Sequence, residues 1–79
     1  MNIGQAVEAL KAGQFVRRSG WNGKGMYLFL IPAEQWTFTN GKNDNLPLMP
    51  FVAMKTADEK QVPWLCSQSD LLAEDWEIC

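Results

Sequence analysis

The N-terminal part of the chain has the hydrophobic periodicity of a helix. Asn2 precedes Gln5 by the spacing of a capping box, and Gly13 stands where a helix normally ends. These signals predict an amphipathic helix over residues 3–12. Its apolar face is formed by Ile3, Ala6, Val7 and Leu10.

Two extended segments follow the predicted helix. Residues 14–18 alternate in character, so Arg17 and Arg18 are expected on opposite faces of a strand. Residues 26–31 are apolar without a polar alternation, and Pro32 ends the run. We therefore expect the second strand to be covered by the helix on one face and by a partner subunit on the other.

The second half of the chain predicts short elements joined by turns. Pro63 favours an edge position for its strand, and Ser67 or Ser69 can cap a short helix. The predicted elements are a strand at 36–39, an exposed loop at 40–50, strands at 51–56 and 61–65, a helix running through 71–73, and a closing strand at 76–78. This order of elements predicts that residues 1–79 form a single α+β domain, with an N-terminal amphipathic helix packed on a small antiparallel β-sheet and a short C-terminal helix.

Composition favours a globular protein that associates with itself. Hydrophobic residues make up 47% of the chain and charged residues 20%, which is apolar enough to fold. A chain of 79 residues builds a single core, and four tryptophans with four phenylalanines exceed what such a core readily covers. Either self-association or a ligand-lined aromatic surface would cover the surplus, and we expect a homo-oligomer.

Charge and cysteine content restrict the partners and the compartment. The net charge of −2 disfavours long nucleic acid, whose binding needs many cations, although a few donors can still hold a small phosphorylated ligand. Cys66 and Cys79 do not suggest a disulfide framework, and the N-terminus lacks the pattern of a signal peptide. The apolar run at 26–31 is too short to span a membrane. We expect a cytoplasmic protein without a membrane partner.

The residue types for catalysis and metal binding are largely missing. The chain has no histidine, which argues against a hydrolytic triad, and two cysteines without histidine do not complete a structural zinc site. We expect no catalytic residue, no metal and no cofactor. Acidic residues gather near the C-terminus, where a helix cap and a solvated helix face explain them better than a cation site or an acid–base pair: Asp70, Glu74, Asp75 and Glu77.

The segment at 17–25 carries the candidate chemistry. Two arginines and Lys24 flank a glycine-rich turn that contains Trp21. Backbone N–H groups of such a turn can cradle phosphate, arginine can bind it bidentately, and an indole can stack on a base. The glycine spacing matches neither a P-loop nor a dinucleotide-binding loop. On these residues alone, an ordinary hairpin with solvent-exposed cations is the simpler alternative.

Aromatic and polar residues near the predicted C-terminal helix are further candidates. Trp76 is predicted to lie in the core, whereas Trp64 is either a core residue or the wall of an aromatic slot between subunits. Ser67, Gln68 and Asp70 can offer polar contacts to a ligand, although helix capping also explains Ser67 and Asp70.

Four stretches of the chain resemble the second type of Thoeris anti-defense proteins, which phages and prophages carry. They cover residues 4–13, 17–26, 54–58 and 62–76. The most specific strings are Gly-Trp-Asn-Gly-Lys-Gly-Met at 20–26 and Asp-Leu-Leu-Ala-Glu-Asp-Trp at 70–76. Residues 33–51 depart from the family pattern.

The resemblance implies a molecular sponge: a homotetramer that sequesters, without cleaving it, the cyclised ADP-ribose signal of a bacterial TIR-domain enzyme. It leaves open a separate site for cyclic oligonucleotides. Trp21 would stack on the base, the backbone at 22–25 with Lys24 would hold phosphate, and Arg17 or Arg18 would neutralise charge. The expected ligand-binding residues are Arg17, Arg18, Trp21, Asn22, Gly23, Lys24, Gly25, Met26, Trp64, Ser67, Gln68 and Asp70.

Two other functions are compatible with the residues. A protein–protein inhibitor or structural oligomer would use exposed aromatic side chains to contact a host protein. A phosphodiesterase or glycosidase has less support, because the chain offers only carboxylates as general bases.

Overall fold

The computed structural model describes residues 1–22, 24–32, 37–39, 41–42 and 45–79. The elements in chain order are α1 (Ile3–Lys11), β1 (Val16–Arg18), β2 (Tyr27–Ile31), β3 (Thr37–Thr39), β4 (Asn45–Pro47), β5 (Phe51–Lys55), β6 (Gln61–Pro63), α2 (Gln68–Leu72) and β7 (Trp76–Ile78). This order confirms the α+β class, with an N-terminal helix, an antiparallel sheet and a short C-terminal helix.

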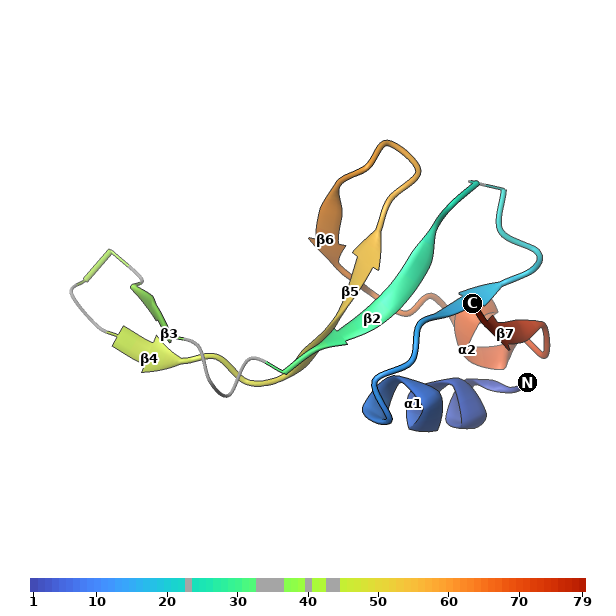
Figure 1. The fold of residues 1–79 in the computed structure, drawn as a ribbon, viewed down its shortest axis with the longest axis horizontal. Helices are drawn as coiled ribbons and strands as arrows, with labels where there is room; N and C mark the ends of the chain where they lie inside the picture. Colours follow the sequence, from blue (N-terminus) through green and yellow to red (C-terminus); the bar gives the residue numbers. More distant parts are fainter. Residues whose placement is uncertain (23, 33–36, 40, 43–44) are drawn as a thin grey trace.

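Five strands form one antiparallel sheet in the order β6-β5-β2-β1-β7. β2 and β5 pair along the centre, with Phe29 opposite Ala53. β6 lies at one edge, which confirms the position predicted from Pro63. β7 lies at the other edge and pairs with β1, so the first and last strands are neighbours and both termini lie at the same end of the molecule (Figure 1).

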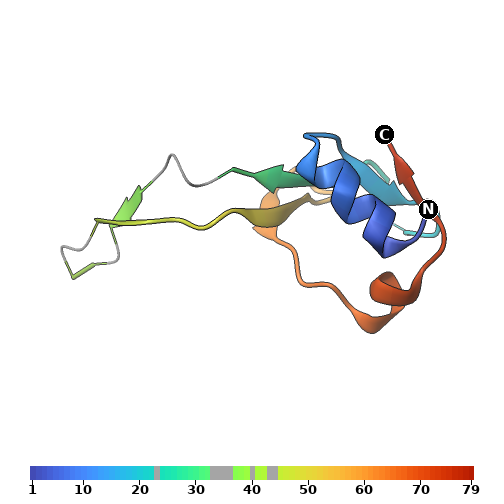
Figure 2. The same cartoon turned by 90° about the horizontal axis from the view of Figure 1, so that it is seen from below.

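Helix α1 packs on one face of this sheet, against β1, β2 and β7 (Figure 2). Its start is the predicted capping box, because Asn2 Oδ1 accepts from the Gln5 backbone N–H and Gln5 Oε1 accepts from the Asn2 backbone N–H, each at 2.9 Å. Gly13 follows the helix at a φ of 85°, a left-handed conformation that suits glycine. The core between helix and sheet consists of Ala6, Ala9, Leu10, Val16, Leu28 and Trp76.

Helix α2 begins at Gln68 and is capped by Ser67, whose Oγ accepts from the Asp70 backbone N–H at 3.1 Å. Of the two serines considered, Ser67 is therefore the one that caps the helix. Trp76 is 2% exposed, which confirms its predicted place in the core. Trp64 is half-buried and packs edge-to-face on Trp76, with ring centroids 5.9 Å apart.

The prediction of an exposed loop at 40–50 is wrong for residues 45–47. These residues form β4, which pairs with β3 in a separate two-stranded sheet that stands away from the five-stranded sheet (Figure 1). Pro47 pairs at the end of this ribbon, where a proline is tolerated because its nitrogen need not donate to a neighbouring strand. Residue 36, which the predicted strand at 36–39 included, lies outside the described residues.

The face of the sheet opposite α1 carries an aromatic cluster. Phe15, which is 47% exposed, lies 5.3 Å from Tyr27 and 6.3 Å from Phe29 between ring centroids. Tyr27 and Phe29 are half-buried within the single chain. Coverage of this face by a partner subunit stays a prediction. In the part of the chain that the structure describes, no helix is long and apolar enough to cross a membrane.

Candidate ligand-binding pocket

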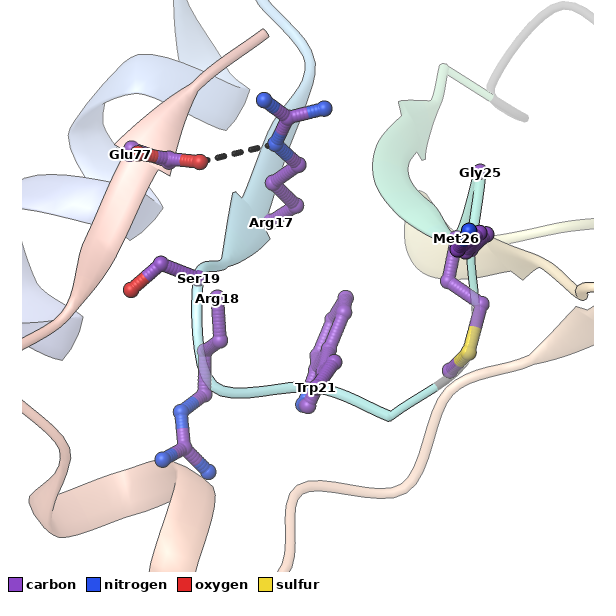
Figure 3. A pocket seen from close by; sticks show the side chains of 8 residues that line it. Arg17, Arg18, Ser19, Trp21, Gly25, Met26 and Glu77 are labelled. Atoms are coloured by element: carbon purple, nitrogen blue, oxygen red, sulfur yellow. Dashed lines mark hydrogen bonds and ion pairs between the residues drawn. The ribbon is translucent and has the colours of Figure 1, made fainter.

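A cavity of about 390 Å³ opens between β1, β7 and the turn that joins β1 to β2 (Figure 3). Two of its sides come from strands, and the third is the glycine-rich turn that the sequence singled out. The cavity is lined by Arg17, Arg18, Ser19, Trp21, Lys24, Gly25, Met26 and Glu77. The fold therefore brings together the cations, the indole and the methionine predicted for the site at 17–26.

Strand β1 sends its two arginines in different directions, as its alternation predicts. Arg17 stands opposite Glu77 across the β1–β7 pair, and its Nε donates to Glu77 Oε1 at 2.8 Å. Both side chains are half-exposed, at 49% and 44%. The hydrogen bond from Arg17 to Glu77 and the attraction of the two charges raise the pKa of the Arg17 guanidinium. Arg17 therefore keeps its charge at the mouth of the cavity.

Arg18 points its guanidinium away from the cavity, toward α2 (Figure 3). Its Nε donates to Asp75 Oδ1 and its Nη1 to Asp70 Oδ1, both at 2.7 Å, and its side chain is 19% exposed. Because two carboxylates already share this one cation, Arg18 braces the site and brings it no uncompensated positive charge. Among the described residues, Arg17 is paired with Glu77 alone and keeps its Nη groups open to a ligand anion, and Lys24 makes no ion pair.

The acidic residues near the C-terminus do not form the predicted solvated helix face. Asp70 and Asp75 bind Arg18, and Glu77 binds Arg17 from a strand. Burial raises the pKa of Asp70, but hydrogen bonds from Arg18 and Trp21 outweigh it and hold that pKa below its usual value. The hydrogen bond from Arg18 likewise holds the pKa of Asp75 below its usual value. The sequence pattern does not reveal these ion pairs, because the two partners of each lie more than fifty residues apart.

The indole of Trp21 forms the floor of the cavity and is held at its edge. Its Nε1 donates to Asp70 Oδ1 at 3.1 Å, and its ring meets the buried Trp76 edge-to-face at 5.4 Å. The turn itself is tied by the Gly20 backbone N–H, which donates to Asp75 Oδ2 at 2.8 Å. A Cβ at Gly20 would lie 2.7 Å from that oxygen, so this close approach requires glycine.

The far end of the turn is fixed to strand β5. Gly25 has a φ of 74°, and its carbonyl accepts from Lys55 Nζ at 3.1 Å. Lys55 also pairs with Glu59 at 3.0 Å and its side chain is largely buried, so its hydrogen bond to the Gly25 carbonyl is partly shielded from water. Lys24 is exposed and makes no ion pair with any described residue.

The remaining predicted residues lie outside this cavity. Asn22 is exposed on the turn, and Gly23 lies outside the described residues. Ser67 caps α2, and Gln68 is exposed at its first position. Trp64, like Trp21, packs edge-to-face on Trp76. Asp70 lies beneath the cavity as the shared partner of Arg18 and Trp21.

The sequence interpretation missed two lining residues. Ser19 follows β1 directly, and Glu77 reaches the cavity from β7. The signal for Glu77 was its alternation with the core residue Trp76, which places it on the opposite face of a strand. Among the described residues, no group of three potential ligands is placed to hold a metal ion.

These features define a small α+β domain with a surface cavity walled by cations and an indole. The chain belongs to the Thoeris anti-defense 2-like family, whose sequence model matches residues 1–79. It is 47% identical, over 83 aligned positions, to Thoeris anti-defense 2 of Bacillus phage SP01, and the alignment covers 99% of this chain and 93% of the phage protein. The family resemblance of the four sequence stretches is thereby confirmed.

Proposed function

We propose that this chain is an anti-defense sponge that binds a cyclised ADP-ribose signal in the cavity described above and releases it unchanged. The observation that carries this proposal is the placement of Arg17, Lys24 and the Trp21 indole around one cavity. Cations suit the pyrophosphate of such a ligand, and an indole suits its base. The similarity to Thoeris anti-defense 2 of a phage supports the anti-defense role.

The cavity offers little for catalysis. Glu77 is its sole carboxylate among the described lining residues, and that group is already bound to Arg17. Hydrolysis of a phosphodiester or glycosidic bond by residues alone requires a general acid and a general base placed on both sides of the bond. Binding without chemical change is therefore the better account of this set of residues.

Capture by a stoichiometric trap requires tight binding. A nanomolar Kd corresponds to about −12 kcal/mol, which exposed charges in water do not supply by themselves. Arg17 and Glu77 are half-exposed in the single chain, so a second copy that closes over the cavity would strengthen every polar contact in it. This requirement supports the expectation of a homo-oligomer, with a tetramer as the form that the family resemblance implies.

Titration calorimetry with cyclic ADP-ribose isomers tests the proposal. We expect saturable binding, and chromatography after heat denaturation should recover the ligand unchanged. The variant Lys24→Gln removes an exposed cation from the cavity and should raise Kd roughly 3- to 10-fold. Lys11→Gln, which removes an exposed lysine on α1, is the matched control. A new product in the chromatogram would replace the sponge by an enzyme.

A protein–protein inhibitor is the second candidate, and exposed apolar side chains favour it. Leu65 is 89% exposed and Leu72 is 75% exposed, on either side of the start of α2. Such side chains often contribute to protein contacts. The same titration separates the two functions, because an inhibitor of this kind would show neither heat nor a thermal shift with any cyclic nucleotide.

A further inference from the structure

Glu77 places a carboxylate inside a cavity whose other charges are positive. It stands on β7 opposite Arg17, and its Oε1 accepts from Arg17 Nε at 2.8 Å. The side chain is 44% exposed and lies on the β7 wall of the cavity, across from Trp21 and Met26 (Figure 3). Glu77 is thus within the space that a ligand on Arg17 would occupy.

A cavity that binds a fully ionised phosphate gains nothing from this group. A carboxylate beside the arginine repels an incoming anion, and it also occupies one donor of the guanidinium. Only Oε1 of Glu77 accepts a hydrogen bond from a described residue, so Oε2 keeps its capacity to accept one. The neutral partner that suits such an oxygen is a hydroxyl group.

Arg17 and Glu77 together present donors and an acceptor side by side. The Nη groups of Arg17 make no hydrogen bond to a described residue and can donate to phosphate, while Glu77 Oε2 can accept from a hydroxyl next to it. A sugar phosphate carries these two kinds of group a few bonds apart. Fully ionised phosphate or pyrophosphate carries only the first, and has no alcohol hydroxyl at a fixed distance from the charge.

We propose that Glu77 is the specificity residue of the cavity, accepting a hydrogen bond from a sugar hydroxyl of the ligand beside the phosphate held by Arg17. This inference rests on the proposed function and deepens it, because it makes the site selective for a sugar-linked phosphate over a free one. The attraction of Arg17 also keeps Glu77 oriented, so the acceptor is in place before the ligand arrives.

The test is the variant Glu77→Gln, which keeps an oxygen that can accept from Arg17 Nε and removes the negative charge. Calorimetry is performed with a cyclic ADP-ribose isomer and with inorganic pyrophosphate. We expect the variant to bind the cyclic ligand roughly 5- to 10-fold more weakly, since hydrogen bonds to charged acceptors are stronger than those to neutral ones. Pyrophosphate should bind the variant as well as, or better than, the wild-type protein, because a repulsive charge is removed.

Other results overturn the proposal. Equal weakening of both probes would make Glu77 a residue that only positions Arg17. Tighter or unchanged binding of the cyclic ligand would make the carboxylate a competitor of the phosphate or place it outside the site. Glu8→Gln, on the exposed surface of α1, is the control and should change neither affinity. A wild-type protein that binds no cyclic nucleotide would instead refute the proposed function, and this inference with it.

Discussion

Asp70 is the residue through which the cavity floor and the β1 strand are joined to helix α2. One oxygen of its carboxylate receives both Arg18 Nη1 and Trp21 Nε1, and its backbone carbonyl accepts from Trp76 Nε1 at 3.0 Å. Its side chain is 13% exposed, so these bonds are shielded from water. Asp70, which the sequence suggested as a ligand contact, therefore supports the Trp21 indole in the free protein.

The low pKa of Asp70 predicts how stability depends on pH. A carboxyl whose pKa is lower in the folded state than in the unfolded state stabilises the fold above its unfolded pKa and loses this contribution as pH falls through the folded value. The unfolding free energy should therefore decrease as pH falls below about 4. Asp70→Asn should cost about 1–3 kcal/mol at pH 7 and progressively less as pH falls below about 4 and the wild-type carboxyl becomes protonated.

Denaturant unfolding at several pH values measures this dependence. Glu8→Gln, whose side chain is exposed on α1, is the control and should follow the wild-type curve. A constant difference between Asp70→Asn and the wild-type protein from pH 7 to pH 2 would contradict a role for the ionised carboxylate.

The amino-acid sequence predicts local contacts in this molecule better than distant ones. The capping box of Asn2 and Gln5 spans three residues and was predicted correctly. The pair of Arg17 and Glu77 spans 60 residues, and its prediction would have required the pairing of β7 with β1 in the right register. A one-residue slip of that register would bring Trp76 or Ile78 opposite Arg17 instead.

At the scale of elements, the turn at 19–26 is held from two sides. The α2–β7 segment binds its beginning through Asp75 and Gly20, and strand β5 binds its end through Lys55 and the Gly25 carbonyl. A turn with several glycines has many accessible conformations, so these two anchors reduce the entropy that a ligand must otherwise remove. The glycine-rich turn could be found from sequence, but its anchors lie on other elements and could not.

Removal of the β5 anchor should weaken ligand binding without removing a lining residue. Lys55→Gln shortens the side chain and removes the charge that reaches the Gly25 carbonyl. We expect a cyclic ADP-ribose isomer to bind roughly 3- to 10-fold more weakly, with a less favourable entropy of binding because the ligand must now order the turn. Calorimetry measures both quantities.

Lys60→Gln is the matched control for the β5 anchor, since Lys60 is exposed and pairs only with Asp58 among the described residues. Equal effects of the two substitutions would mean that Lys55 acts through net charge and not through Gly25.

At the scale of the whole molecule, the N-terminal and C-terminal parts of the chain meet in one sheet, where the first strand pairs with the last. β1 and β7 are neighbours, and the Cys79 backbone N–H donates to the Phe15 carbonyl at 3.0 Å. The helix covers one face of the sheet, while the other face carries the aromatic cluster of Phe15, Tyr27 and Phe29. Among the described side chains the aromatic surplus is thus divided, with Trp21, Trp64 and Trp76 packed together and Phe15, Phe29 and Phe51 partly exposed.

The exposed apolar residues around α2 predict self-association. Leu65 and Leu72 would each gain stability by leaving water, about 1.5–3 kcal/mol per fully buried side chain. Sedimentation should therefore give a mass that is a multiple of the 9.0 kDa chain, and the melting temperature should rise with protein concentration, because association stabilises the folded state by mass action. The double variant Leu65→Ser, Leu72→Ser should shift the mass toward the monomer, whereas Leu72→Met, which keeps an apolar side chain, should not. A wild-type protein that sediments as a monomer at micromolar concentration would refute the prediction and leave the cavity to bind its ligand from one chain alone.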